Sequence, residues 1–218
     1  MEIERGKPNW ADALAPRTLD RVLLDEANHR IANEVASALA ALRLAQSAKG
    51  QQTRQRMIEI AIDRLEGFGE CSRMLAGLSL GRTDAGDLVE QLCRAMIRSR
   101  IAFVPDRVLL DLGKLVVDGE TARRIAMIAY ELIMNALKHA FPLGGGELEI
   151  RLKKLGDNII LSIIDDGPGL GHSSMAERTG LGGRIVKELV HASSGIIECE
   201  TGPHGTVVHV MLPKGLHA

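Results

Sequence analysis

Residues 120–140 constrain the fold of this chain more than any other stretch, because they read as one long amphipathic helix, ETARRIAMIAYELIMNALKHA. At about 100° per residue, Glu131, Asn135 and Lys138 fall within about 60° of one another, with His139 just beyond. The opposite face is an apolar stripe, which we expect to pack on a sheet. An asparagine inside a helix is mildly unfavourable and needs a reason. A Mg²⁺ or phosphate ligand would supply that reason, and an ordinary solvated helix face is the alternative.

Composition excludes several classes of protein. The 218 residues suffice for one large domain or two small ones. The formal net charge is −1 and aromatic residues make up 2%, so we expect no nucleic-acid partner. No apolar run reaches the roughly 20 residues that span a bilayer, and the N-terminus lacks a signal-peptide core, so we expect no membrane partner. Three widely spaced cysteines favour packing roles in a reducing, cytoplasmic protein.

The N-terminal third has the periodicity of two helices. Apolar residues recur every three or four positions from residue 18 for about 30 residues, and again over residues 58–78. A polar turn near Gly50 separates them, and prolines interrupt the loose arm at residues 1–17. We therefore expect an antiparallel helical hairpin. Its two apolar stripes exceed what one hairpin buries, so we expect a homodimeric four-helix bundle, or packing against the rest of the chain.

Beyond a boundary at residues 81–86, helices and strands are mixed. The expected elements are a helix at 87–98, strands at 101–104 and 115–117, the helix at 120–140, strands at 147–153 and 158–165, a helix at 180–193, and strands at 196–200 and 206–212. Regular βαβ alternation is missing from this order. We therefore expect an α+β fold, with helices on one face of a mixed sheet.

Two glycine-containing segments in this half indicate a ligand site. Alternation along residues 158–165 places Asp165 at the end of the inward face, where it either caps the next turn or recognises an amino group of a bound base. The turn Gly167-Pro168-Gly169 follows directly and leaves room for a ligand against the backbone. A second glycine cluster, at residues 180–183, opens a helix whose free N–H groups favour phosphate. Residues 170–179 between the two clusters suit a mobile lid.

Four segments, ELIMNALKHAFP, IIDDGPGL, GLGGRIVKELV and TGPHGT, resemble in order and spacing the ATP-site boxes of the Bergerat-fold ATPases. The resemblance implies an α/β sandwich domain that binds ATP and Mg²⁺. The residues it implies are Glu131 and Asn135 at the Mg²⁺, Lys138 and His139 near the phosphates, Asp165 on the adenine amino group, Gly167 and Gly169 around the base, Gly180, Leu181 and Gly182 at the triphosphate, and Thr206 near the adenine.

The segment EANHRIAN, at residues 26–33, resembles the phosphoacceptor box of HWE-type bacterial sensor histidine kinases and their closest relatives. The resemblance implies that His29 accepts the phosphoryl group. Glu26, three residues earlier, lies within reach of the imidazole and would fix its tautomer. Arg30 and Asn33 could steady the phosphoryl group. The box usually has Lys where Ala32 stands, and the Trp that names the HWE group is absent, so a sister group is the better match.

Together these features predict a histidine-kinase core with a dimerisation and phosphotransfer hairpin at residues 18–80 and a catalytic ATP-binding domain at 87–218. His29 would take a phosphoryl group from Mg·ATP and pass it to an aspartate of a response-regulator receiver domain. A histidine phosphotransfer adaptor and a phosphatase for the regulator are the alternatives. Seventeen residues before the hairpin are too few for a sensor domain, so we expect the signal to come from a separate sensor protein.

Overall fold

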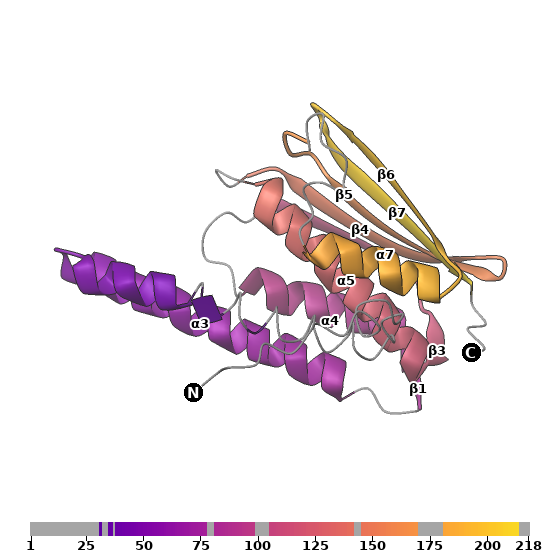
Figure 1. Ribbon diagram of the computed structural model, residues 1–218, viewed down its shortest axis with the longest axis horizontal. Helices are drawn as coiled ribbons and strands as arrows, with labels where there is room; N and C mark the ends of the chain where they lie inside the picture. Colours follow the sequence, from indigo (N-terminus) through magenta and orange to yellow (C-terminus); the bar gives the residue numbers. More distant parts are fainter. Residues whose placement is uncertain are drawn as a thin grey trace, which may run out of the picture.

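The computed structural model describes residues 31, 35–36, 38–77, 81–98, 105–141, 145–169 and 181–213 (Figure 1). Its elements are α3 (Gln51–Ala76), β1 (Arg82–Asp84), α4 (Ala85–Arg98), β2 (Arg107–Leu112), β3 (Val116–Asp118), α5 (Gly119–His139), β4 (Glu147–Leu155), β5 (Asn158–Asp165), α7 (Leu181–Ala192), β6 (Ile196–Gly202) and β7 (Gly205–Pro213). Most of the first helix expected from the sequence lies outside the described residues.

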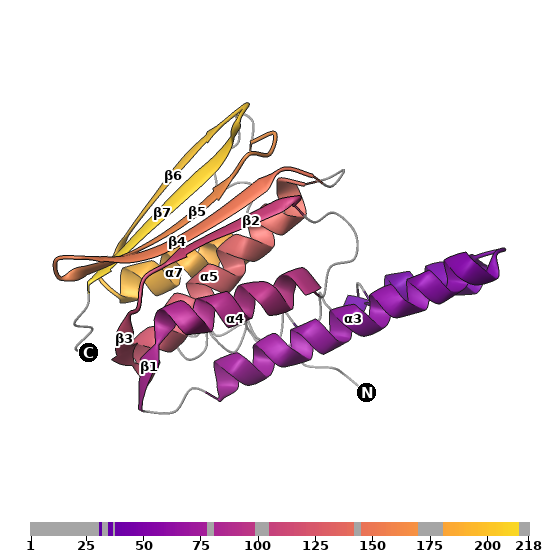
Figure 2. The same cartoon turned by 180° about the vertical axis from the view of Figure 1, so that it is seen from behind.

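The main sheet has five strands in the order β2-β4-β5-β7-β6. Strands β4, β5, β7 and β6 are antiparallel to their neighbours, whereas β2 runs parallel to β4. Helices α5 and α7 lie on one face of this sheet, and α4 packs on α5 from the far side (Figures 1 and 2). The expected α+β class with a mixed sheet is confirmed.

The core between the sheet and the helices is formed by side chains at alternate positions of the strands. In β4, β5 and β7 the apolar residues at alternate positions face α5 and α7 and are at most 6% exposed. These residues are Leu148, Ile150, Leu152, Ile159, Leu161, Ile163, Val208, Val210 and Leu212. Burying branched aliphatic side chains on this scale is the main stabilising contribution to such a two-layer fold.

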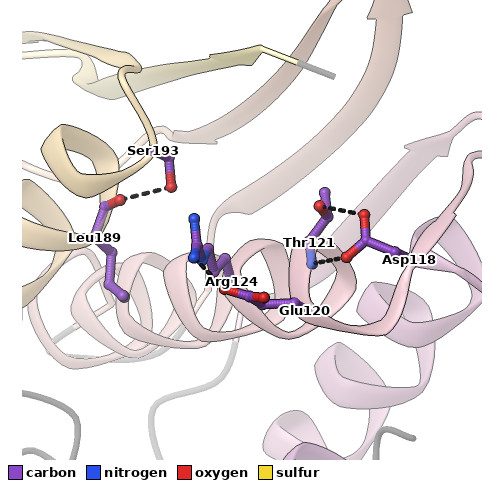
Figure 3. Close-up of polar contacts among 6 residues, drawn as sticks. All are labelled: Asp118, Glu120, Thr121, Arg124, Leu189 and Ser193. Atoms are coloured by element: carbon purple, nitrogen blue, oxygen red, sulfur yellow. Dashed lines mark hydrogen bonds and ion pairs between the residues drawn. The ribbon is translucent and has the colours of Figure 1, made fainter. Parts of the chain in front are cut away.

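Helix α5 begins at a well-defined N-cap. Asp118 accepts a hydrogen bond from the Thr121 backbone N–H at 2.9 Å and another from the Thr121 hydroxyl at 2.7 Å (Figure 3). The backbone hydrogen bond from Thr121 is the main cause that lowers the pKa of the Asp118 carboxyl. One turn further on, Glu120 pairs with Arg124. The cap fixes the register of the helix that carries Glu131 and Asn135.

Strands β1 and β2 were not predicted from the sequence. Val108, Leu110 and Leu112 pack against the core, but Leu109 on the other face is also apolar and hides the period of two. The strand expected at 115–117 occurs one residue later, as β3. It pairs with β1, which lies inside the segment expected to be a boundary. The strand expected at 101–104 lies outside the described residues.

The C-terminal part of α3 belongs to the same core as the sheet and its helices. Cys71 is 3% exposed, and Met74 and Leu75 pack against that core. Arg98 of α4 donates to both carboxylate oxygens of Glu70 at 2.9 Å. The N-terminal part of α3 projects away from the sheet (Figure 2) and packs instead against the helical residues 38–47, through Ala38, Ala41 and Ala61. None of the helices in the described ranges has the length and apolar character that crossing a bilayer requires.

Candidate functional site

Asp165 occupies the inner face at the last position of β5, as its place in the strand predicts. It is 9% exposed and lies opposite Leu148 of β4 and Thr206 of β7. Its Oδ1 atom accepts hydrogen bonds from the backbone N–H groups of Gly167, at 3.1 Å, and Thr206, at 3.2 Å. Neither bond uses Oδ2, so the carboxylate keeps a second acceptor atom for a ligand.

Burial determines the protonation of this group. Desolvation of the buried carboxylate raises the pKa of Asp165, the two backbone hydrogen bonds partly oppose the shift, and the neighbouring charge of Asp166 adds to it. Of the two roles that the sequence left open for Asp165, the turn cap is present, because Asp165 accepts the backbone N–H of Gly167 in the turn after β5. A buried carboxylate with one oxygen engaged also suits a ligand amino group, which would stabilise its ionised form.

The loop after β5 closes against the end of α5. A Cβ atom at Gly167 would lie 2.5 Å from the Cα of Ala140, which follows α5, so only glycine fits there. Gly169 has a φ of +69°, which glycine adopts without strain. The predicted glycine turn thus brings Asp165 beside the last turn of α5, where Lys138 and His139 are exposed.

The β6–β7 turn closes on the same carboxylate from the other side. A Cβ atom at Gly205 would lie 1.8 Å from the backbone oxygen of Asp165, and Gly205 has a φ of +127°. Thr206, the next residue, is 9% exposed, and its hydroxyl lies 3.4 Å from that of Thr201. Three segments distant in the sequence therefore meet around Asp165.

On α5, Glu131 and Asn135 lie one turn apart and toward the interior of the fold. Glu131 is 7% exposed, which is more buried than its position on the polar helix face predicts. The Nδ2 atom of the half-buried Asn135 is inaccessible to solvent and has no hydrogen-bond partner in the described part of the chain. An amide turned by 180° would present its oxygen instead, so this position fits an oxygen-seeking cation or a polar ligand.

The described residues contain no group of three or more His, Cys, Asp and Glu side chains that could hold a metal by itself. Mg²⁺ in nucleotide sites is normally held by one or two protein side chains, with phosphate and water completing its shell. Glu131 and Asn135 fit that type of site and do not fit a closed, all-protein metal cage.

Helix α7 supplies the second glycine segment. It begins at Leu181, and Gly182 lies in its first turn, close to the expected start at residue 180. The N–H groups of a first helical turn have no partner within the helix and attract anions. The helix packs against α5. Gly180 lies outside the described residues, as do Glu26, His29, Arg30 and Asn33, so the predicted phosphoacceptor segment stays a prediction.

Three residues of the site were missed from the sequence. Ala140 is the contact of Gly167, and Gly205 is the contact of Asp165. Asp166 accepts the backbone N–H of Glu147 at 2.7 Å, which ties the end of β5 to the start of β4. Gly205 precedes the predicted Thr206 in GPHGT, and Asp166 follows the predicted Asp165 in DDGPG. Their position inside these motifs was the sequence signal that could have identified them. Nothing local distinguishes Ala140, because its role follows from the packing alone.

Comparison with known proteins agrees with this geometry. Residues 120–216 match the family model described as histidine kinase-, DNA gyrase B-, and HSP90-like ATPase. The chain is 28% identical over 230 residues to blue-light-activated histidine kinase 2 of Erythrobacter litoralis, an alignment that covers 98% of this chain and 62% of that protein. It is 28% identical over 223 residues to the sensor histidine kinase PdtaS of Mycobacterium tuberculosis, covering 94% of this chain and 43% of that one.

The chain thus spans less than two thirds of the length of either relative. The solved histidine kinase domain of the Erythrobacter litoralis blue-light activated histidine kinase superposes with a TM-score of 0.58 at 20% identity, over 83% of this chain and 96% of that one. At that identity the superposition shows a shared fold. The resemblance of the four ATP-site segments is confirmed in that residues 120–216 match the model of the histidine kinase-, DNA gyrase B-, and HSP90-like ATPase family.

Proposed function

We propose that this chain is the core of a histidine kinase, which takes the γ-phosphoryl group of Mg·ATP onto His29 and passes it to an aspartate of a response-regulator receiver domain. The observation that carries the proposal is the geometry around Asp165. A buried carboxylate with one oxygen engaged by Gly167 and Thr206 keeps its other oxygen for the adenine amino group. The two relatives, a blue-light-activated histidine kinase and a sensor histidine kinase, support the same proposal.

Asn135 and Glu131 are the residues that would hold Mg²⁺, because they present an amide and a carboxylate from adjacent turns of α5. The ion, when bound, neutralises charge on the phosphates during transfer. Lys138 and His139, exposed at the end of α5, are close in sequence to these groups and would contact the phosphates. The first turn of α7, with Leu181 and Gly182, would offer backbone N–H groups to the triphosphate.

The phosphoacceptor role of His29 rests on the segment EANHRIAN. A neutral imidazole nitrogen would attack the γ-phosphorus, the bond to the bridging oxygen would break, and ADP would leave. Glu26 would orient the ring through its other nitrogen, while Arg30 and Asn33 would steady the incoming group. Such catalysis depends mainly on positioning and charge neutralisation.

The decisive experiment is incubation with γ-labelled ATP, followed by acid and base treatment of the labelled protein. A phosphoramidate on imidazole is acid-labile and base-stable, and we expect that behaviour. His29→Gln should abolish labelling and preserve ATP binding, because the ATPase domain does not include residue 29. His191→Gln changes an exposed histidine of α7 and is the matched control, which should still be labelled. Glu26→Gln should slow labelling without changing ATP affinity.

Two other outcomes identify the alternative functions. A chain that binds Mg·ATP, is never labelled by it, and accepts phosphate from a phosphorylated regulator is a phosphotransfer adaptor. A chain that releases inorganic phosphate from that regulator is a phosphatase. Either result would overturn the kinase proposal while leaving the ATPase domain intact.

We also propose that residues 18–80 form a dimerisation hairpin and that two copies build a four-helix bundle. Large apolar side chains of residues 31–65 are 38% to 59% exposed in the single chain, which favours a covering partner. These are Ile31, Val35, Leu39, Leu42, Leu44, Ile62 and Leu65.

Leu42→Glu should split the dimer in light scattering, whereas Ser47→Glu, an equally charged change at an exposed polar position away from that helix face, should leave it whole. A wild-type monomer at high micromolar concentration would contradict the bundle. We further propose a cytoplasmic location.

A further inference from the structure

Strand β6 forms one edge of the main sheet, and its outer face differs from the rest of that face. Ile196, Glu198 and Glu200 point away from the helices, while Ile197 and Cys199 pack against the core. Figure 2 shows the sheet face that the helices leave uncovered, with β6 at its margin. In the described part of the chain β6 pairs with β7 alone. Alternate backbone N–H and C=O groups of β6 therefore point outward, as in any edge strand.

The charges on the outer face are balanced at one side of the sheet and unbalanced at β6. Toward β2 and β4 each carboxylate has a cation beside it: Glu147 with Arg107 at 3.1 Å, Glu149 with Arg151 at 2.6 Å, and Asp111 with Lys153 at 2.6 Å. Glu198 and Glu200 are exposed, and neither forms an ion pair within the described ranges. The β6 edge therefore carries two uncompensated negative charges.

A hollow of about 380 Å³ lies on the same face beside Glu198. Its apolar lining comes from Ile160, Ile196 and Met211, and Ile196 is 51% exposed. A hydrogen bond of 2.8 Å between Ser162 Oγ and His209 Nδ1 occupies the polar part of its lining. Ile196 therefore belongs to an open apolar surface that has the carboxylate of Glu198 at its rim.

We propose that the β6 edge binds an extended segment of a partner protein as a sixth, antiparallel strand. Two basic side chains of that segment would lie opposite Glu200 and Glu198, and an aliphatic side chain two positions further would pack on Ile196, at the rim of the hollow. Backbone hydrogen bonds would supply affinity and the alternating side chains specificity. Pairing of β6 with β6 of a second copy would set glutamates against glutamates and is disfavoured. The proposal does not rest on the nucleotide site or on His29.

The probe is a fluorescent heptapeptide in which two lysines alternate with valines and are followed by an isoleucine, titrated with the full chain and read by anisotropy. We expect saturable binding that weakens at least tenfold when glutamates replace the lysines. Glu198→Lys combined with Glu200→Lys should weaken binding of the lysine peptide by at least tenfold. Asp157→Lys, at an exposed acidic residue of the β4–β5 turn, is the matched control and should change binding less than twofold.

A second peptide separates strand addition from simple charge attraction. N-methylation of the backbone nitrogens along one edge of the peptide removes donors without changing its charge. We expect methylation of the pairing edge to abolish binding and methylation of the opposite edge to leave it. Equal binding of both methylated peptides, or equal binding of the lysine and glutamate peptides, would overturn the proposal. Self-association through β6 that Glu198→Lys leaves unchanged would also overturn it.

Discussion

The backbone N–H of Thr206 donates a hydrogen bond of 3.2 Å to Oδ1 of Asp165, directly across the β5–β7 pair. The same oxygen accepts a hydrogen bond from the backbone N–H of Gly167, so one atom links β7 to the loop after β5. A side chain that fixes two backbone segments and presents a second oxygen beside them combines structural and binding roles. Substitutions at this position should therefore be judged by ligand affinity and by stability together.

Asp165→Asn should weaken ATP binding by roughly 10- to 100-fold, because an amide replaces the carboxylate as acceptor, and a hydrogen bond to a charged group contributes about 1.5–3 kcal/mol. Isothermal titration calorimetry gives the affinity. Asp157→Asn, in the exposed β4–β5 turn, is the control and should bind as the wild type does. Wild-type affinity in the Asp165 variant would remove this residue from the adenine site.

The raised pKa of Asp165 predicts a pH dependence for binding of adenosine, which lacks the titrating phosphates of ATP. An amino group prefers the ionised carboxylate, so affinity should rise as the pH increases through the raised pKa of this group. Asp165→Asn should lose that dependence. A wild-type affinity that falls with increasing pH over the same range would contradict the assigned role.

Asn135→Ala should weaken binding of ATP in the presence of Mg²⁺ more than in its absence, because the amide is proposed to serve the ion. The free energy of unfolding should not fall, since the Nδ2 atom of Asn135 is buried and forms no hydrogen bond within the described ranges. Urea denaturation and calorimetry measure the two effects. Gln91→Ala, at an exposed position of α4, serves as the control. An unchanged dependence on Mg²⁺ would exclude Asn135 from the ion site.

Gly167→Ala should both destabilise the fold and weaken ATP binding, because the added Cβ would lie 2.5 Å from the Cα of Ala140. Overpacking of this kind commonly costs about 1–3 kcal/mol. Gly202→Ala is a matched control, since a Cβ there meets nothing within 4 Å. Thermal unfolding with and without ATP separates the two effects. Equal behaviour of the two variants would show that the contact with Ala140 relaxes freely.

Asp118→Ala should lower the free energy of unfolding by about 1 kcal/mol at neutral pH through loss of the N-cap of α5. The pKa of Asp118 is lowered in the folded protein, so its charge stabilises the fold above the ordinary carboxyl pKa. That contribution is lost as the pH falls through the lowered value. The difference between wild type and variant should therefore shrink from about pH 6 to about pH 2, and a difference that grows would contradict the sign.

The sequence predicted those elements whose periodicity is plain. Helix α5 and strand β4 each have one apolar and one polar face, whereas β5 and β7 are long runs rich in Ile and Val. Each of the four was found within two residues of its expected ends. Strand β2 was missed because Leu109 interrupts the polar face that Arg107 and Asp111 form, which leaves no plain alternation over six residues. The pairing of β1 with β3 depends on partners more than 30 residues apart, which local pattern does not encode.

The site was predictable where a residue type is unusual for its place. Asp165 at the end of an apolar strand face, and Asn135 inside a helix, stood out for that reason. The burial of Glu131 was unexpected, because a helical wheel shows only one element and cannot show what packs on its polar face. Ala140 acquires its role from the approach of a loop 27 positions later, a tertiary contact with no local signal.

The last turns of α3 pack into the same core as the sheet, and this packing decides where a chimeric protein can be joined. Cys71, Met74 and Leu75 fill space beside α4, so a fragment that begins at residue 81 would open that space to water. A graft from a related kinase should therefore be joined upstream of Gly67, which is itself buried, so that the donor helix enters before the shared packing begins. Joined there, the foreign segment and the recipient would form a continuous helical rod, and any rotation applied to the graft would reach α4 directly.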